Sequence, residues 1–275
     1  MNWSRAWTIA RTDLRQLRQS RDFWLPMLIL AGLFFVVFPT VLLFGIRLAE
    51  NVNVVQKISS TLDILPQQVK DAVRGTTPQA RAGYALAVYL FAPLAVVVPL
   101  TISTAVGANA IVGERERGSG EFLAHSPASE TEIYVGKLIA AMIPGYLATV
   151  VGFGIYSLIV NGLVGPQVGG WFFPTRDWWV LMFWIVPPFI GLALSLIVRV
   201  SARVKSATAA QQASGLVTLP LILVAYGQTS GSVLFGQASA GLVIGALAWL
   251  GAALGLMRGA RAVTRERLLG VDSGA

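Results

Sequence analysis

The 275-residue sequence contains no cysteine, which excludes disulfides, thiolate metal sites and cysteine nucleophiles. It contains a single histidine, His125, so a site built from several histidines is excluded, and in a polar loop this side chain is expected to be solvated. No G-x-x-x-x-G-K-[ST] segment is present, so the chain lacks a Walker-type phosphate-binding loop. We therefore expect no cofactor or metal bound by this chain, and any energy source must come from a partner.

Charged residues are also scarce. They make up 12% of the chain, against 55% hydrophobic residues, and the mean hydropathy of +0.67 is too high for a soluble domain of this length. The net charge of +8 would suggest nucleic acid in a soluble protein, but here the cations flank long apolar runs. We interpret them as charges that orient the chain in a membrane, with no nucleic-acid partner.

Six uncharged runs are long enough to cross a bilayer as helices. They predict an all-α membrane protein with spans near 23–46, 84–112, 138–164, 178–198, 207–228 and 239–257. With both termini in the cytoplasm, fifteen Lys and Arg residues fall inside and six outside, as the positive-inside rule favours. The expected organisation is a cytoplasmic helix at 1–22, a transmembrane domain at 23–257 and a cytoplasmic tail at 258–275; the 231–238 stretch could be re-entrant.

Residues 3–21 carry the pattern of an amphipathic helix. An apolar stripe recurs at helical spacing, and arginines lie off the stripe, as expected for a helix in the headgroup plane. An amphipathic helix packed on a neighbouring element would show the same pattern. The stripe consists of Trp3, Trp7, Ala10, Leu14 and Leu17.

Three further patterns concern the spans themselves. Small residues at four-residue spacing in the last span predict close helix packing, at Gly241, Gly245, Gly251 and Gly255. Tryptophans around the fourth span predict an interfacial belt, at Trp171, Trp178, Trp179 and Trp184. No acidic residue falls within a predicted span, which argues against an ion-coupled transporter or a proton relay.

The 113–137 loop is the most informative segment. Ser129 and Glu132 match a capping box, which predicts that the third span starts in the cytoplasm. Residues 121–124 have room for a short helix before Pro127. Such a helix would expose Phe122 and Leu123 among charges, as a docking knob for a partner requires. A solvated connector is the alternative interpretation.

This loop resembles that of type-2 ABC transporter permeases, on Ala110 to Leu123, Ser126-Pro127 and Gly136-Lys137. The stretch from Ser201 to Gly215, leading to Leu219-Pro220-Leu221, also resembles the entry to the fifth span of that family. The resemblance implies a second permease subunit and ABC ATP-binding subunits as partners, which would hold ATP and Mg. It also implies an ATPase-coupling interface at Glu114, Arg115, Glu116, Arg117, Glu121, Phe122, Leu123 and Pro127.

The resulting hypothesis is the permease subunit of an ATP-driven exporter in the plasma membrane, in contact with membrane lipids and not itself an enzyme. Its substrate could be a lipid, a hydrophobic drug or an antibiotic. A membrane scaffold or sensor that recruits a cytoplasmic partner through the 113–137 loop is the alternative. An integral membrane enzyme is disfavoured, because no His, Cys or acidic pair has a catalytic arrangement.

Overall fold

The computed structural model describes residues 1–48, 67–204, 206–227 and 238–259, and this part of the chain is helical without strands. The prediction of an all-α membrane protein is confirmed. In chain order the elements are α1 (Trp3–Gln19), α2 (Arg21–Gly32), α3 (Phe38–Leu48), α5 (Gln67–Ala72), α6 (Pro78–Ala85), α7 (Leu94–Ala108), α8 (Val112–Glu116), α9 (Gly120–Ala124), α10 (Glu130–Leu163), α11 (Gly165–Val168), α12 (Arg176–Val180), α13 (Val186–Ser201), α14 (Ala207–Gly227) and α15 (Ala238–Gly259).

Five helical stretches within the described residues are long and apolar enough to cross a membrane. They are Arg21–Leu48, Pro78–Ala108, Glu130–Leu163, Arg176–Ser201 and Gly241–Gly259. The 21-residue α14 packs along α7 and α13 but is not among the five, and polar Gln211, Gln212 and Ser214 occupy its first half. The expected number of six crossings and the orientation of the termini stay predictions.

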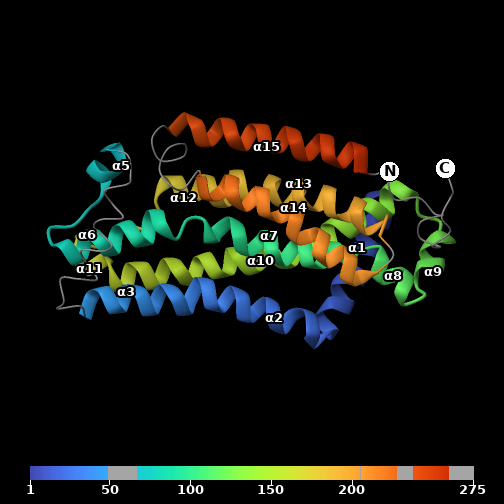
Figure 1. Cartoon of the computed structure of the whole chain (residues 1–275), viewed down its shortest axis with the longest axis horizontal. Coiled ribbons are helices and arrows are strands. Elements are labelled where there is room, and N and C mark those ends of the chain that lie inside the picture. The colour runs from blue at the N-terminus through green and yellow to red at the C-terminus, as the bar shows by residue number, and fades with distance from the viewer. Residues whose placement is uncertain (49–66, 205, 228–237, 260–275) are drawn as a thin grey trace.

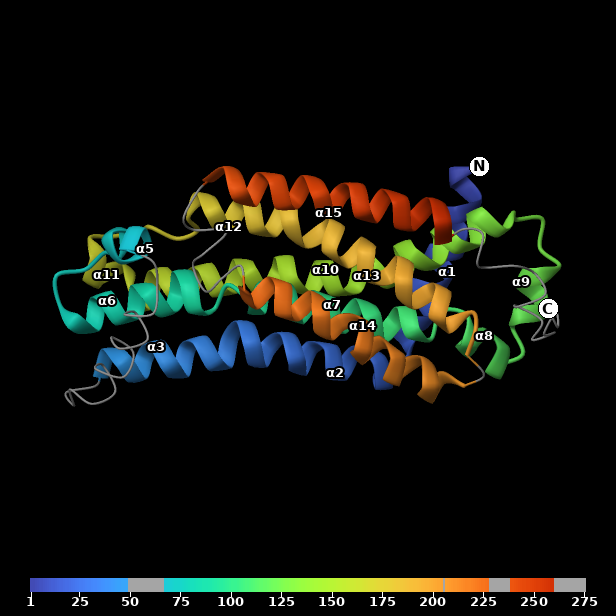
Figure 2. The ribbon, with the colours of Figure 1, turned by 45° about the horizontal axis from the view of Figure 1, so that its top comes forward.

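The long helices form an elongated bundle, and the short elements lie at its two ends (Figure 1). α1, α8 and α9 gather at one end, which we call the loop end, and α5, α6 and α11 lie at the other. Whereas α2 runs along the bundle, α1 runs across its long axis (Figure 2). Ser20, in an extended conformation between the two helices, allows this change of direction.

Helices α7 and α13 occupy the interior of the bundle, because most of Pro78–Ala108 and of Arg176–Ser201 is buried. In contrast, most of Arg21–Leu48 and of Gly241–Gly259 is exposed, and the exposed side chains are largely apolar. Apolar surface of this extent suits a hydrocarbon solvent rather than water.

Three π-helical turns interrupt the spans, at Leu33–Val37, Leu86–Leu90 and Leu181–Ile185. Side chains outside these turns bind backbone oxygens within two of them. The Tyr156 hydroxyl donates to Ala87 O at 2.6 Å, and the Trp178 indole donates to Val88 O at 2.8 Å. The Tyr146 hydroxyl donates to Met182 O at 3.2 Å. These bonds satisfy oxygens that would be costly to leave unpaired in the bundle.

The tryptophan belt is only partly as expected. Trp178 is 1% exposed and stacks on Phe153 with ring centroids 5.7 Å apart, so it belongs to the core rather than to the interface. Its buried indole N–H has a backbone acceptor, which is what makes this burial possible. Trp171, Trp179 and Trp184 are exposed.

The face that α15 turns to the bundle consists of small residues. Gly241, Gly245 and Gly255 are buried, and a side chain at Gly245 or Gly255 would overlap Trp184 or Ser195. Gly251 is half-buried, and a methyl group there would contact Leu192 at 3.7 Å. Close approach of α15 to its neighbours therefore depends on glycine at two of these positions.

Two predicted features lie almost wholly outside the described residues: the 231–238 stretch, of which only Ala238 is described, and the 258–275 tail, of which only residues 258 and 259 are described.

Candidate functional site

The start of α1 is bonded to the loop end of the bundle. Asn2 caps α1 by accepting a hydrogen bond from the Ser4 N–H at 3.0 Å, and its own backbone N–H donates to Glu132 Oε1 at 2.6 Å. The Arg5 guanidinium donates to Pro127 O at 2.8 Å. The first turn of α1 is thus attached both to α10 and to the segment that precedes it.

The first turn of α10 has the predicted capping box. The Glu132 N–H donates to Ser129 Oγ at 3.3 Å, and the Ser129 N–H donates to Glu132 Oε2 at 2.9 Å. These two bonds satisfy N–H groups that have no partner within the helix. Because Glu132 also binds Asn2, one carboxylate fixes the start of α10 and the start of α1 together.

One turn further on, α1 and α10 touch through small residues. Ala6 and Ala10 of α1 are fully buried. A methyl group at Gly136 would lie 2.8 Å from Ala6 O and 2.9 Å from Ile9 Cβ, closer than packed atoms allow. Glycine at position 136 is therefore required for the helices to approach this closely.

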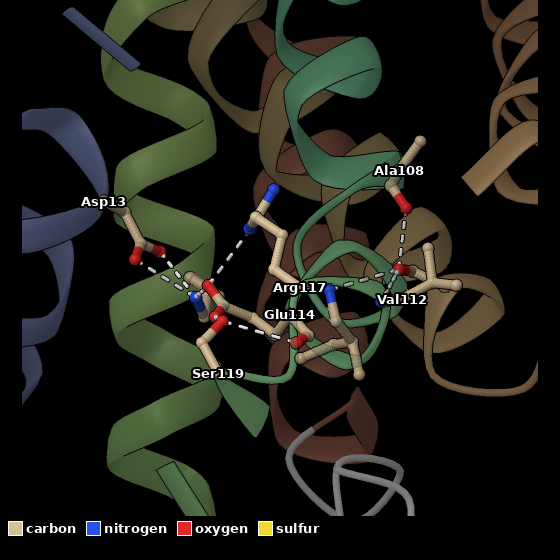
Figure 3. Close-up of polar contacts among 9 residues, drawn as sticks. Asp13, Ala108, Val112, Glu114, Arg117 and Ser119 are labelled. Carbon is tan, nitrogen blue, oxygen red and sulfur yellow. Dashed lines mark hydrogen bonds and ion pairs between the residues drawn. The ribbon is translucent and has the colours of Figure 1, made fainter. Parts of the chain in front are cut away.

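A buried ion cluster joins three elements at the loop end (Figure 3). Lys137 of α10 is 2% exposed, and its Nζ lies 2.9 Å from Asp13 Oδ2 of α1 and 2.5 Å from Glu114 Oε1 of α8. The Ser119 hydroxyl donates to the second oxygen of Glu114, and Arg117 NH2 lies 3.5 Å from Glu114 Oε1. We call these five residues the ion cluster.

The cluster balances two carboxylates against two cations, and its members differ in how well they are compensated. Burial dominates at Asp13 and raises the pKa of its carboxyl above 3.8, although Lys137 opposes this shift. Burial also acts to raise the pKa of Glu114, but the charge and hydrogen bond of Lys137, the Ser119 hydroxyl and Arg117 outweigh it, so this pKa falls below 4.5. Glu114 is thus held as a carboxylate although only 6% of its side chain is exposed.

A serine at the end of α13 holds the turn between α7 and α8. Ser201 Oγ donates to Ala108 O at 2.7 Å and accepts from the N–H groups of Ile111 and Val112 at 3.3 and 3.2 Å (Figure 3). This buried side chain satisfies three backbone groups where the helix is broken. The position of α8 is therefore set by α13 as well as by α10.

Comparison with known proteins identifies the family of this chain. A family model described as ABC-2 family transporter protein matches residues 7–233, which is most of the chain. The chain belongs to this family. A search of curated proteins returned no match. Membership makes the chain a multi-pass transmembrane component of an ABC transporter. Domains of this family carry no ATPase of their own, and the family implies association with ABC ATP-binding subunits.

In this ABC-2 permease, the predicted coupling residues divide into an exposed and an inward group. Phe122 on α9 is 81% exposed, and Glu116, Arg117, Glu121 and Pro127 are exposed as well. Leu123 is half-buried and packs on the core, and Glu114 is buried in the ion cluster. The side chain of Arg115 lies outside the described residues. The loop therefore presents Phe122, while Glu114 fixes the loop to the permease itself.

The predicted stripe on α1 is also divided. Trp3 and Trp7 are 64% and 51% exposed, whereas Ala10 is buried and Leu14 and Leu17 are half-buried. The packed face is centred on Ala6, Ala10 and Asp13, and so lies to one side of the expected stripe. One side of this helix packs on α10, as the second interpretation requires, and the adjacent side is an exposed apolar surface. The location of the helix in the headgroup plane stays a prediction.

Three functional residues were not identified from the sequence pattern alone: Asp13, Lys137 and Ser201. Lys137 and Ser201 appear only within the segments that resemble the family. A signal existed for Asp13, since it is the only acid in α1 and follows Ala6 and Ala10 at helical spacing. An isolated carboxylate on the small-residue side of a helix indicates an inward partner.

The ion cluster borders a cleft of about 420 Å³ between α1, α7, α8 and α10. Leu17 and Phe23 line one part of it, and Asn109, Glu114 and Lys137 line another. Because this cleft separates the helices beside the ion cluster, α1 and α8 are joined there mainly by the charged side chains of the cluster. Few packed side chains lie between the two helices.

Proposed function

We propose that this permease is the membrane subunit of an ATP-driven exporter, and that α8 and α9 receive the movement of a partner ATP-binding subunit. The observation that carries the proposal is Phe122, a large aromatic side chain that is 81% exposed on a five-residue helix. Exposed Glu116, Arg117 and Glu121 precede it in the same loop. An aromatic anchor with a charged rim is the usual composition of an interface centre.

The base of α9 is suited to transmit force into the bundle. Leu123 packs on the core beside buried Ala124, so α9 is anchored on the side away from Phe122. Through Ser119 and Glu114, the same segment is bonded to Lys137 on α10. A displacement of Phe122 would therefore act on α10, a 34-residue helix that runs the length of the bundle.

ATP binding can bias a permease only if the partner contacts two of its states differently. The cleft beside the ion cluster gives α8 and α1 room to shift relative to each other. We propose that the partner favours one placement of α9 when it binds ATP and another after hydrolysis. The substrate site would then alternate between the two membrane faces.

The interior of the bundle favours an apolar substrate. Within the described residues, the buried charged side chains are Glu114, Glu132 and Lys137, all at the loop end. Away from the loop end, a permanently charged substrate would find no buried counter-ion along the described part of the spans. Lipids, hydrophobic drugs and antibiotics suit such a lining, and we propose export of a compound of this kind from the plasma membrane.

A second permease chain, either a copy or a relative, completes the proposed complex. It would pack against part of the apolar surface of α2, α3 or α15, where large side chains are exposed. Lipid would cover the remainder.

The decisive experiment reconstitutes the permease with its ATP-binding subunit in liposomes and compares Phe122→Ala with the wild type. Removing an interface anchor of this kind costs about 2 kcal/mol or more, roughly a 30-fold loss in affinity. We expect weaker binding of the subunit, with loss of both ATPase stimulation and transport. Trp171→Ala is the matched control, because Trp171 is 71% exposed and lies between α11 and α12, away from the loop end.

Normal binding and normal ATPase stimulation with Phe122→Ala would remove α9 from the interface. A stable complex of the wild-type permease with a protein that is not an ATPase would favour the scaffold function instead.

A further inference from the structure

One side of α1 carries positive charge without compensating acid. The helix contains four arginines, and its only carboxylate, Asp13, turns inward to Lys137. Arg5 is bonded to Pro127 O. Arg11, Arg15 and Arg18 are exposed, and at spacings of four and three they share one side of the helix. We call these three residues the arginine face.

The arginine face adjoins the exposed apolar side of the helix. At about 100° per residue, Trp3, Trp7 and Leu14 point to the side next to Arg11 and Arg18. None of the three arginines forms an ion pair with another residue in the part of the chain that the structure describes. Because α1 runs across the bundle axis (Figure 2), its length would lie along a membrane surface rather than through it.

We propose that the arginine face binds the phosphate groups of anionic phospholipids, and that this binding holds α8 and α9 where the ATP-binding subunit can drive them. This inference rests on the proposed function. It adds that the anionic phospholipid content of the leaflet that α1 contacts regulates the coupling of the ATP-binding subunit to the permease.

The contacts between α1 and the loop provide the connection. The start of α1 is bonded to Glu132 and Pro127, its middle is packed on Gly136, and Asp13 reaches Glu114 through Lys137. These contacts span the flanks of α8 and α9. A lipid that fixes the position of α1 therefore also fixes the base of the loop. For this, the lipid must bind α1 more tightly in one of the two states of the permease than in the other.

Each arginine near an anionic surface strengthens binding by about fivefold, so the three together contribute about a 100-fold preference. Since the attraction acts between exposed charges, it should weaken at high salt. These two properties distinguish headgroup binding from simple burial of Trp3 and Trp7 in the membrane.

The test uses the full permease with its ATP-binding subunit in nanodiscs of phosphatidylcholine alone or mixed with phosphatidylglycerol. We expect the mixture to increase ATPase stimulation in the wild type. The triple variant Arg11→Gln, Arg15→Gln, Arg18→Gln should lose this increase and retain less phosphatidylglycerol in native mass spectrometry. Arginine-to-lysine substitution at the same positions should preserve most of the increase, because headgroup attraction depends mainly on charge.

The control removes the same charge elsewhere. Arg47, Arg74 and Arg81 are exposed in or near α3, α5 and α6, so glutamine at these positions lowers the net charge equally while α1 is unchanged. If the triple glutamine variant of α1 does not fold, its three single variants replace it, and each should weaken phosphatidylglycerol retention by about fivefold.

Three results would overturn the inference. Equal stimulation of the wild type in both lipid mixtures would show that anionic lipid does not act on coupling. If the control triple variant lost the increase in ATPase stimulation equally, the effect would be one of general charge. If soluble glycerol phosphate produced the same increase in nanodiscs of phosphatidylcholine alone, the ligand would be a soluble phosphate rather than a lipid. In each of these cases the wild-type permease would still stimulate the ATPase of its partner subunit. If the wild-type permease stimulated the ATPase in no lipid mixture, the proposed function itself would be refuted.

Discussion

Replacing Lys137 with methionine leaves two buried carboxylates without their shared cation. The side chains of Glu114 and Asp13 are 6% and 17% exposed, so most of each side chain is withdrawn from solvent. Breaking a buried ion pair by removing one partner costs about 3–5 kcal/mol. At about 2–4 °C per kcal/mol, the midpoint of thermal unfolding should fall by about 6–20 °C.

Arg117 provides an internal control for this prediction. It contacts the same oxygen of Glu114 as Lys137, but at 3.5 Å rather than 2.5 Å, and its side chain is 53% exposed. Exposed ion pairs contribute about 0–1 kcal/mol, so Arg117→Met should change the unfolding midpoint little. The two variants therefore remove the same charge and the same kind of contact, and differ mainly in burial.

The assay is thermal unfolding of purified permease in detergent, followed by ATPase stimulation in liposomes. Lys137→Met should destabilise the permease and uncouple it, while the double variant Lys137→Met, Asp13→Asn should recover part of the lost stability because one uncompensated charge is removed. If Lys137→Met unfolds within about 1 kcal/mol of the wild type and couples normally, the ion cluster does not fix the loop.

Three further predictions concern single positions. Gly136→Ala places a methyl group against the backbone of α1, so we expect the free energy of unfolding to fall by about 1–3 kcal/mol and proteolysis of α1 to occur earlier. Gly154→Ala is the control, because Gly154 lies on the same helix with open space around it, and this variant should be neutral or slightly stabilising. Asn161→Ala removes the acceptor of two backbone N–H groups in the 172–173 segment, at 2.9 and 3.0 Å. The free energy of unfolding should fall by about 1–3 kcal/mol for each N–H group left without an acceptor. An unchanged midpoint of thermal unfolding would show that Asn161 does not hold this segment. The pKa of Glu114 is lowered, so its contribution to stability is complete above pH 4.5 and is lost as the pH falls through its folded pKa; Glu114→Gln should therefore flatten the acid limb of stability measured in detergent against pH.

Much of the fold follows from local sequence signals. The long apolar runs coincide with helices because backbone groups in hydrocarbon must be satisfied within the same segment. The capping box at Ser129 marks the start of α10, and α9 ends before Pro127, so local signals also predict where these two helices begin and end. Each of these signals acts over a few residues, so one sequence is sufficient to recognise it.

The ion cluster could not be predicted in the same way. Asp13, Glu114 and Lys137 are separated by 101 and 23 positions, and their contact depends on how α1 lies across the bundle. The family resemblance placed Glu114 in the coupling interface, whereas its side chain is buried in the ion cluster. Trp178 shows the same limit, because its burial depends on an acceptor, Val88 O, in a different span.

The π-helical turns have a consequence for how this chain should be compared with others. A π turn holds one more residue than the α-helical turn it replaces, so the helix beyond it is rotated by about 100° relative to an uninterrupted count. In the spans that contain 33–37, 86–90 and 181–185, residues on the two sides of each turn cannot be assigned to faces with one continuous 3.6-residue repeat. Pairing this chain correctly with a relative whose helices are regular would require a one-residue gap at each turn, and ungapped pairing would match lipid-facing positions with buried ones.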